Sequence, residues 1–239
     1  MFYYGYGLDP TIILLIPAMI FALVAQGMVK SAFSTYSRVR NGKGLTGAQA
    51  ARQVLDNNGL SDVRIEQISG SLTDNYDPRS RVLHLSSDVC NVDSVSAVSV
   101  ACHEAGHAIQ HANGYVPLKI RNGIVPVVNF ASNISWILIV IGLLLLFQQS
   151  GSTSALGNLI FDIGVIAFVA VIVFHLITLP VELNASKRAI EQIETLSLVA
   201  SEDIRGSRKV LRAAAMTYVA ALAMAVANLL RILAIRGRD

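Results

Sequence analysis

The chain has 239 residues, of which 53% are hydrophobic and only 15% are charged, and its mean hydropathy is +0.54. This composition is too apolar for an ordinary soluble enzyme and favours an integral membrane protein. The net charge is +3. Because the basic residues flank apolar segments, the membrane explains that charge, and we do not expect nucleic acid as a partner.

Four apolar segments predict membrane spans, at residues 11–29, 124–147, 156–179 and 213–235. A helix needs about 20 apolar residues to cross a bilayer. The last segment is rich in alanine, and a complete crossing would place Arg236 and Arg238 outside, against the usual charge distribution. A tilted or half-inserted final helix therefore stays open as an alternative to a fourth span.

The distribution of Lys and Arg predicts the orientation of the spans. No Lys or Arg precedes the first span, whereas four cations follow it closely: Lys30, Arg38, Arg40 and Lys43. The first span therefore reads as an anchor with an outside N-terminus, not as a cleaved signal peptide. Residues 30–123 and 180–212 are expected in the cytoplasm, and the uncharged loop 148–155 outside.

The segment His103-Glu104-Ala105-Gly106-His107 is one copy of the pattern H-E-x-x-H. On a helix, residues four apart share a face about 6 Å apart along the axis, so both imidazoles can bind one zinc ion while Glu104 serves as general base. Asp93 or Ser94 is a suitable N-cap for this helix, and Gly114 a suitable stop. The alternative is a core helix with two buried histidines, but that leaves a buried Glu104 unexplained.

A catalytic zinc ion needs a third protein ligand. His111 lies roughly 12 Å beyond His103 along the same helix, so it is expected in a supporting, surface or packing role. Glu182 follows the third span and returns to the same membrane face as the motif, which makes it the better choice. The alternative for Glu182 is a role unrelated to metal binding, because a carboxylate in the first turn of a helix that begins after Pro180 is favoured by the helix dipole.

The soluble part before the motif contains a predicted helix and a predicted hairpin. Thr46 and Gln49 form a capping-box pattern, and Gly59 would end that helix. Residues 63–68 and 81–86 are interpreted as the two strands of the hairpin. An edge strand beside the metal helix could pair with the backbone of a peptide substrate, although an ordinary covering strand is equally compatible with the pattern. The residues proposed for this edge strand are Val82, Leu83, His84 and Leu85.

The two cysteines, Cys90 and Cys102, both fall in the predicted cytoplasmic part. We therefore expect free thiols and no disulfide. Cys102 is next to His103 in sequence but points about 100° away on a helix, so a small buried residue is favoured over a zinc ligand.

Four strings of residues resemble the YugP-type membrane zinc metallopeptidases, a family of bacterial neutral zinc peptidases, and more remotely the gluzincin-like membrane proteases. They are L-T-D-N-Y-D-P at 72–78, V-A-C-H-E-A-G-H-A-I-Q-H at 100–111, L-P-V-E-L-N-A-S-K-R at 179–188 and L-R-A-A-A-M-T-Y-V-A at 211–220. The resemblance implies His103, His107 and Glu182 as zinc ligands, Glu104 as catalytic base, and peptide-bond hydrolysis.

The chain departs from that pattern in two places. Members of the family commonly have a histidine where this chain has Asn75, and the remoter proteases have an aspartate where it has Ser186. Ser186 and Asn184 could instead supply weaker hydrogen bonds near the metal, or be simple polar groups on the helix surface. Three residues are candidates to stabilise the oxyanion of the transition state: Arg188, Tyr76 and His175.

Together these features predict a single membrane peptidase domain that is mainly α-helical, with about four transmembrane helices and a small cytoplasmic α+β zincin-like part. The expected function is a zinc-dependent endopeptidase of the cell membrane that cuts membrane proteins or peptides at the cytoplasmic surface. Cleavage within the bilayer is less suited, because 97–112 is too short and polar for a span. The rival from another class is a non-catalytic zinc-binding membrane scaffold or chaperone-like subunit. Self-association or a membrane partner stays open.

Overall fold

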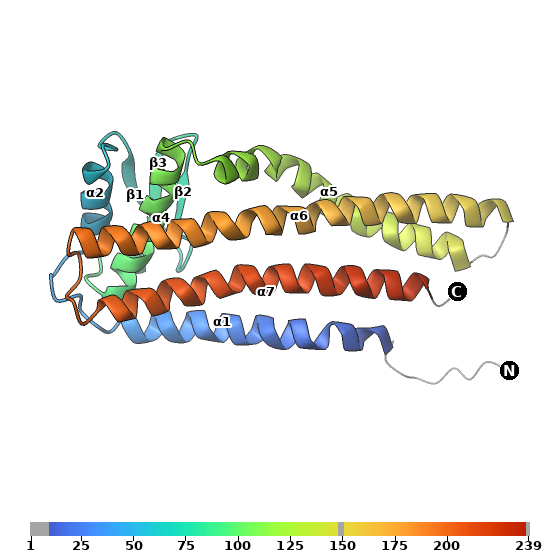
Figure 1. Ribbon diagram of the computed structural model, residues 1–239, viewed down its shortest axis with the longest axis horizontal. Helices are drawn as coiled ribbons and strands as arrows, with labels where there is room; N and C mark the ends of the chain where they lie inside the picture. Colours follow the sequence, from blue (N-terminus) through green and yellow to red (C-terminus); the bar gives the residue numbers. More distant parts are fainter. Residues whose placement is uncertain (1–9, 148–150, 238–239) are drawn as a thin grey trace. The chain divides into compact units, whose positions relative to one another are not determined.

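The computed structural model describes residues 10–147 and 151–237 (Figure 1). Contacts within the chain divide it into two compact units. The first unit comprises residues 1–24, 121–177 and 219–239, and the second comprises 25–120 and 178–218. The long helices contribute residues to both units, and all the predicted metal ligands belong to the second.

Among the residues that the structure describes, four helices are long and apolar enough to cross a membrane, judged by length and composition. They are α1 (Ile16–Tyr36), α5 (Val116–Phe147), α6 (Gly151–Thr195) and α7 (Ile204–Arg236), and a short 3-10 helix, η1 (Pro10–Leu14), precedes α1. Their apolar stretches are mostly not covered by protein: Phe130 and Ile166 are each 70% exposed. Large apolar side chains in such positions are suited to contact with lipid.

Helix α6 runs without interruption from Gly151 to Thr195, past Pro180, where we expected the third span to end. A proline removes one backbone donor, but a long apolar helix with regular turns on both sides can contain it. Glu182 therefore lies inside a continuous helix and not in a first helical turn. The dipole explanation for its charge is consequently removed.

The other predicted boundaries also shift. Helices α5 and α7 begin before the apolar segments 124–147 and 213–235, because their polar first turns continue the same helix. Residues 196–203 separate α6 from α7, so the predicted segment 180–212 contains the end of one long helix and the start of the next.

Helices α2 (Gly47–Asn57) and α4 (Val95–Ala112) pack together in the second unit. The predicted capping box of Thr46 and Gln49 is present. Ser94 is the N-cap of α4, and Gly114, at φ +63°, follows the end of that helix. The core between these helices is closely packed and apolar, with Val54, Leu55, Val98, Ala101, Cys102 and Ala105 all buried.

The three strands form one small sheet beside α4 (Figure 1). They are β1 (Arg64–Ile68), β2 (Asn75–Asp77) and β3 (Val82–Ser86), and the short α3 (Ser87–Cys90) follows. The order in the sheet is β1-β3-β2, with β1 parallel and β2 antiparallel to β3.

The predicted hairpin and its edge strand are therefore wrong. The segment interpreted as a turn contains β2, so the chain reverses twice before β3 and arrives parallel to β1. Strand β3, with Val82, Leu83, His84 and Leu85, is the central strand and is paired on both sides. Its backbone groups are already used by its neighbours and cannot bind a peptide.

In the first unit, Arg236 near the end of α7 forms an ion pair with Asp162 of α6. The same guanidinium donates to Asn158 Oδ1 at 2.9 Å and lies 4.9 Å from the ring centroid of Phe161. The last turn of α7 and the early part of α6 therefore lie at the same end of this unit. The charge of Arg236 is thus neutralised by a partner within this unit.

Candidate metal centre

The second unit brings together three side chains that can hold a metal ion. His103 and His107 lie one turn apart on α4, and Glu182 lies on α6. Glu182 Oε2 is 3.3 Å from His103 Nε2 and 3.5 Å from His107 Nε2. Two ligand atoms that each lie 2.0–2.1 Å from a tetrahedral zinc ion are about 3.3–3.4 Å apart. The two measured separations fit such an ion.

The second nitrogen of each imidazole has its own partner. Ser186 Oγ lies 3.2 Å from His103 Nδ1, and Gln110 Oε1 lies 3.0 Å from His107 Nδ1. An amide oxygen only accepts, so His107 donates from Nδ1 and keeps the lone pair on Nε2 free for a metal. The same tautomer suits His103, because both Nε2 atoms face Glu182.

Gln110 links the two metal-binding helices and was not predicted from the sequence. It is fully buried, and its Nε2 donates to Val181 O at 2.8 Å and to Asn184 Oδ1 at 2.9 Å. Arg188 Nε donates to the same Asn184 oxygen at 2.9 Å. In the sequence, the position of Gln110 three residues after His107, on the same helix face, was the indication that the two side chains could interact.

Gly106, inside the motif, lies at a close approach of α4 to α6. A Cβ atom at this position would lie 2.7 Å from the carbonyl oxygen of Ala185. Only a residue without a side chain therefore fits, and Ala185 is one turn after Glu182. This contact therefore brings the helix of Glu182 close to the helix that carries the two histidines.

Glu104 is 9% exposed and sits beside the three ligands without joining them. Burial raises the pKa of its carboxyl above the usual value; the two histidines lower that pKa, while Glu182 and Asp74 raise it. Burial lowers the pKa of His107, but the adjacent carboxylates of Glu182 and Glu104 outweigh that effect, so the pKa of the imidazole is raised. Two buried carboxylates at one place favour a cation between them.

A cavity of about 220 Å³ opens at His103 and Glu104. Most of its wall is apolar, formed by Val29, Leu72, Val100, Val210, Leu211 and Ala214. Asp74, Thr217 and Tyr218 add polar groups. Asp74 is held in place by the backbone N–H of Ser86, at 2.7 Å, and by its hydroxyl. The quoted strings at 72–78 and 211–220 contain several of these residues, but the sequence does not show that they meet.

The three candidates for oxyanion stabilisation are not among the residues that line this cavity in the described part of the chain. Tyr76 contacts His111 instead, with its hydroxyl 2.9 Å from Nδ1, so His111 has the packing role that was one of its expected alternatives. Arg188 is bound to Asn184. His175 belongs to the first unit, where its ring packs against Phe174.

Cys90 and Cys102 are free and buried, as expected. Complete burial raises the pKa of the Cys102 thiol, which keeps it protonated. A protonated thiol is a poor metal ligand, and Cys102 is not part of the cluster.

Four apolar helices and a cluster of two histidines and a glutamate, with a buried carboxylate beside it, place this chain among helical membrane proteins with a metallopeptidase-like site. The chain belongs to the family described as "Putative neutral zinc metallopeptidase", whose model matches residues 11–237. It is also 46% identical over 230 residues to "Putative membrane protease YugP" of Bacillus subtilis (strain 168), which covers 95% of this chain and 98% of that protein. No solved structure matches the chain significantly.

Proposed function

We propose that this protein is a zinc-dependent endopeptidase that hydrolyses peptide bonds of membrane proteins or peptides at the cytoplasmic surface of the cell membrane. The observation that carries the proposal is the spacing of His103 Nε2, His107 Nε2 and Glu182 Oε2, with Glu104 buried beside them. The family and the relative's name support zinc and proteolysis.

The donor set suits catalytic zinc better than structural zinc. Structural zinc sites are usually closed by four protein ligands, whereas catalytic sites have three and an open position. When bound here, zinc would polarise the scissile carbonyl and lower the pKa of water at its open position. Ser186 and Gln110 orient the two imidazoles for that role.

Glu104 has the role of general base and then general acid. It takes a proton from the attacking water and delivers it to the leaving amine. Burial raises the pKa of the Glu104 carboxyl from its usual acidic range towards neutral pH. A group whose pKa lies nearer the working pH can accept a proton in one step and give it up in the next.

The apolar cavity beside Glu104 suggests which residues flank the cleaved bond. A cavity of about 150 Å³ lined by aliphatic side chains holds benzene, and this one is larger, at about 220 Å³. We therefore expect a large apolar side chain, aliphatic or aromatic, to enter it. Strand β2 begins directly after Leu72 and Asp74, which line this cavity, and it is paired with another strand on one side only. We therefore expect the backbone of the substrate to pair with the free edge of β2.

The cytoplasmic placement rests on the distribution of charges. Cations crowd just after α1, in the last turns of α6 and in the first turns of α7, all in parts of the chain that belong to the second unit. Helix α4, which carries both histidines, is not among the four candidate spans of the described residues. This supports a site at the membrane surface over one whose histidines lie on a spanning helix.

The test measures bound zinc per chain and cleavage of an unfolded reporter protein in detergent. We expect Glu104→Gln to keep zinc and lose cleavage, and Glu182→Ala to lose both. Glu66→Gln, an exposed change on β1, is the matched control and should alter neither. Unchanged zinc and cleavage in Glu104→Gln and Glu182→Ala would contradict the proposal. Zinc without cleavage by the parent protein would favour the scaffold.

A further inference from the structure

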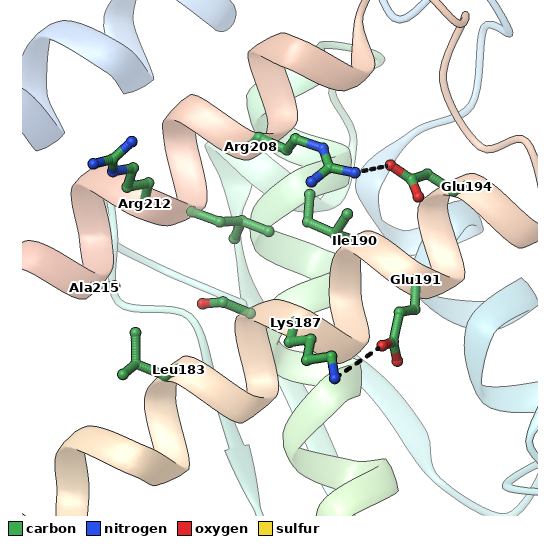
Figure 2. A pocket seen from close by; sticks show the side chains of 10 residues that line it. Leu183, Lys187, Ile190, Glu191, Glu194, Arg208, Arg212 and Ala215 are labelled. Carbon is green, nitrogen blue, oxygen red and sulfur yellow. Dashed lines mark hydrogen bonds and ion pairs between the residues drawn. The ribbon is translucent and has the colours of Figure 1, made fainter.

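A second cavity, of about 560 Å³, lies in a groove between α6 and α7 within the second unit (Figure 2). It is separate from the cavity at Glu104, although Leu211 lines both. Its wall combines apolar side chains with charged ones, and none of the steps proposed above uses those charges. This groove therefore calls for an explanation of its own.

The groove changes character along its length. Leu183 and Ala215 stand at the end nearest the apolar stretches of the two helices, whereas Glu194 and Arg208 stand at the other end. Leu211 and Arg212 lie between these ends on α7. From Leu183 to Glu194 the helix rises about 16 Å. One groove thus spans the change from hydrocarbon-like to polar surroundings that occurs at a bilayer interface.

The charges of the groove leave one cation without a partner. Lys187 lies 3.7 Å from Glu191, and Arg208 is paired with Glu194. Figure 2 shows these two pairs and Arg212 extending away from both. Arg212 is exposed, and among the described residues it makes no hydrogen bond or ion pair. The ammonium of Lys187 is also largely open, because its side chain is 74% exposed.

We propose that this groove binds an anionic phospholipid of the cytoplasmic leaflet. Its phosphate would lie at Arg212, and its first acyl carbons along Leu183 and Ala215. Basic pockets between transmembrane helices on the cytoplasmic side bind such headgroups, and an arginine fork suits a phosphate. A small soluble anion would use the cations but not the apolar half of the groove, which is why a lipid fits better.

The site would adjoin the metal centre. Ser186 lines the groove, and its Oγ lies 3.2 Å from His103 Nδ1. The groove is therefore separated from a predicted zinc ligand by one side chain. This closeness does not depend on peptidase activity, so lipid binding can be tested without a substrate.

The experiment uses the full-length protein in neutral detergent, with phosphatidylglycerol or phosphatidylcholine added. It measures the unfolding temperature of the protein and, by native mass spectrometry, the lipids that the protein retains. Arg212→Gln is compared with Lys209→Gln, which removes one exposed charge from the same helix outside the groove. We expect phosphatidylglycerol to stabilise the parent and Lys209→Gln at several-fold lower concentration than phosphatidylcholine. Arg212→Gln should lose most of this preference, and Arg212→Lys should keep part of it.

Three results would overturn the proposal. Equal responses to the two lipids would show that no headgroup is selected. Equal losses in Arg212→Gln and Lys209→Gln would assign the effect to general surface charge. If millimolar inorganic phosphate displaced the lipid and raised the unfolding temperature of the protein as much as the lipid does, the groove would be a site for a soluble anion. Because the unfolding temperature of each variant without lipid is measured first, a folding defect is recognised separately.

Discussion

Replacing Gly106 with alanine tests whether the contact between α4 and α6 sets the geometry of the metal centre. The added Cβ would lie 2.7 Å from Ala185 O, whereas ordinary contacts begin at 3.4 Å. The helices must therefore separate locally by about 0.7 Å. Since both surfaces are helix backbone, neither can turn aside, and overpacking of this kind costs about 1–3 kcal/mol.

The separation would act directly on the ligands. Glu182 lies one turn from Ala185, and zinc sites tolerate deviations of only about 0.2 Å in metal–ligand distance. We expect the zinc affinity of Gly106→Ala to fall by about 10- to 100-fold, the range seen when supporting groups around a metal are lost. Competition with a chelator of known affinity measures this change, and thermal unfolding of the metal-free protein measures the packing cost.

Gly27→Ala is the matched control, because a Cβ on Gly27 meets no atom within 4 Å. Alanine is a better helix former than glycine by about 1 kcal/mol, so this variant should keep its zinc and unfold at the same or a higher temperature. If Gly106→Ala behaved like Gly27→Ala in both assays, the close contact would not determine the site, and the reasoning would be refuted.

Three other predictions follow from the same structure. Gln110→Leu should lower zinc affinity by about 10-fold or more at nearly constant volume, because the Nδ1 partner of His107 is lost; unchanged affinity in a chelator titration would contradict this. Ala214→Leu fills the cavity beside Glu104, so cleavage next to large apolar residues should fall relative to cleavage next to alanine, and product sequencing that shows no change of preference would exclude that subsite. Cysteines placed at Thr153 and Gly237 should both react with an impermeant thiol reagent added to intact cells, because the Arg236 contacts put these ends together; labelling of only one would contradict a fourth full span.

Several features were predictable from the sequence because they depend on neighbours along the chain. The capping box at Thr46, the N-cap at Ser94 and the four-residue spacing of His103 and His107 are set within one or two helical turns. The apolar segments were recognised for the same reason, since hydropathy over about 20 residues decides whether a helix can span a bilayer. Their polar extensions were missed because hydropathy does not mark where an apolar helix becomes a polar one.

The tertiary structure decided what depends on distant segments. A short strand inside an apparent turn reversed the chain once more, and it moved β3 from the expected edge to the centre of the sheet. The path of α6 past Pro180 brought Glu182 to within 3.5 Å of both histidines, and Gly106 allowed that approach. Gln110 also forms hydrogen bonds to Val181 and Asn184, which lie 71 or more positions away in the sequence. Periodicity and spacing in the sequence show only which side chains share a helix or a strand. A metal centre, its supporting hydrogen bonds and its cavity require separate elements to approach within a few ångströms. Only tertiary packing determines that approach.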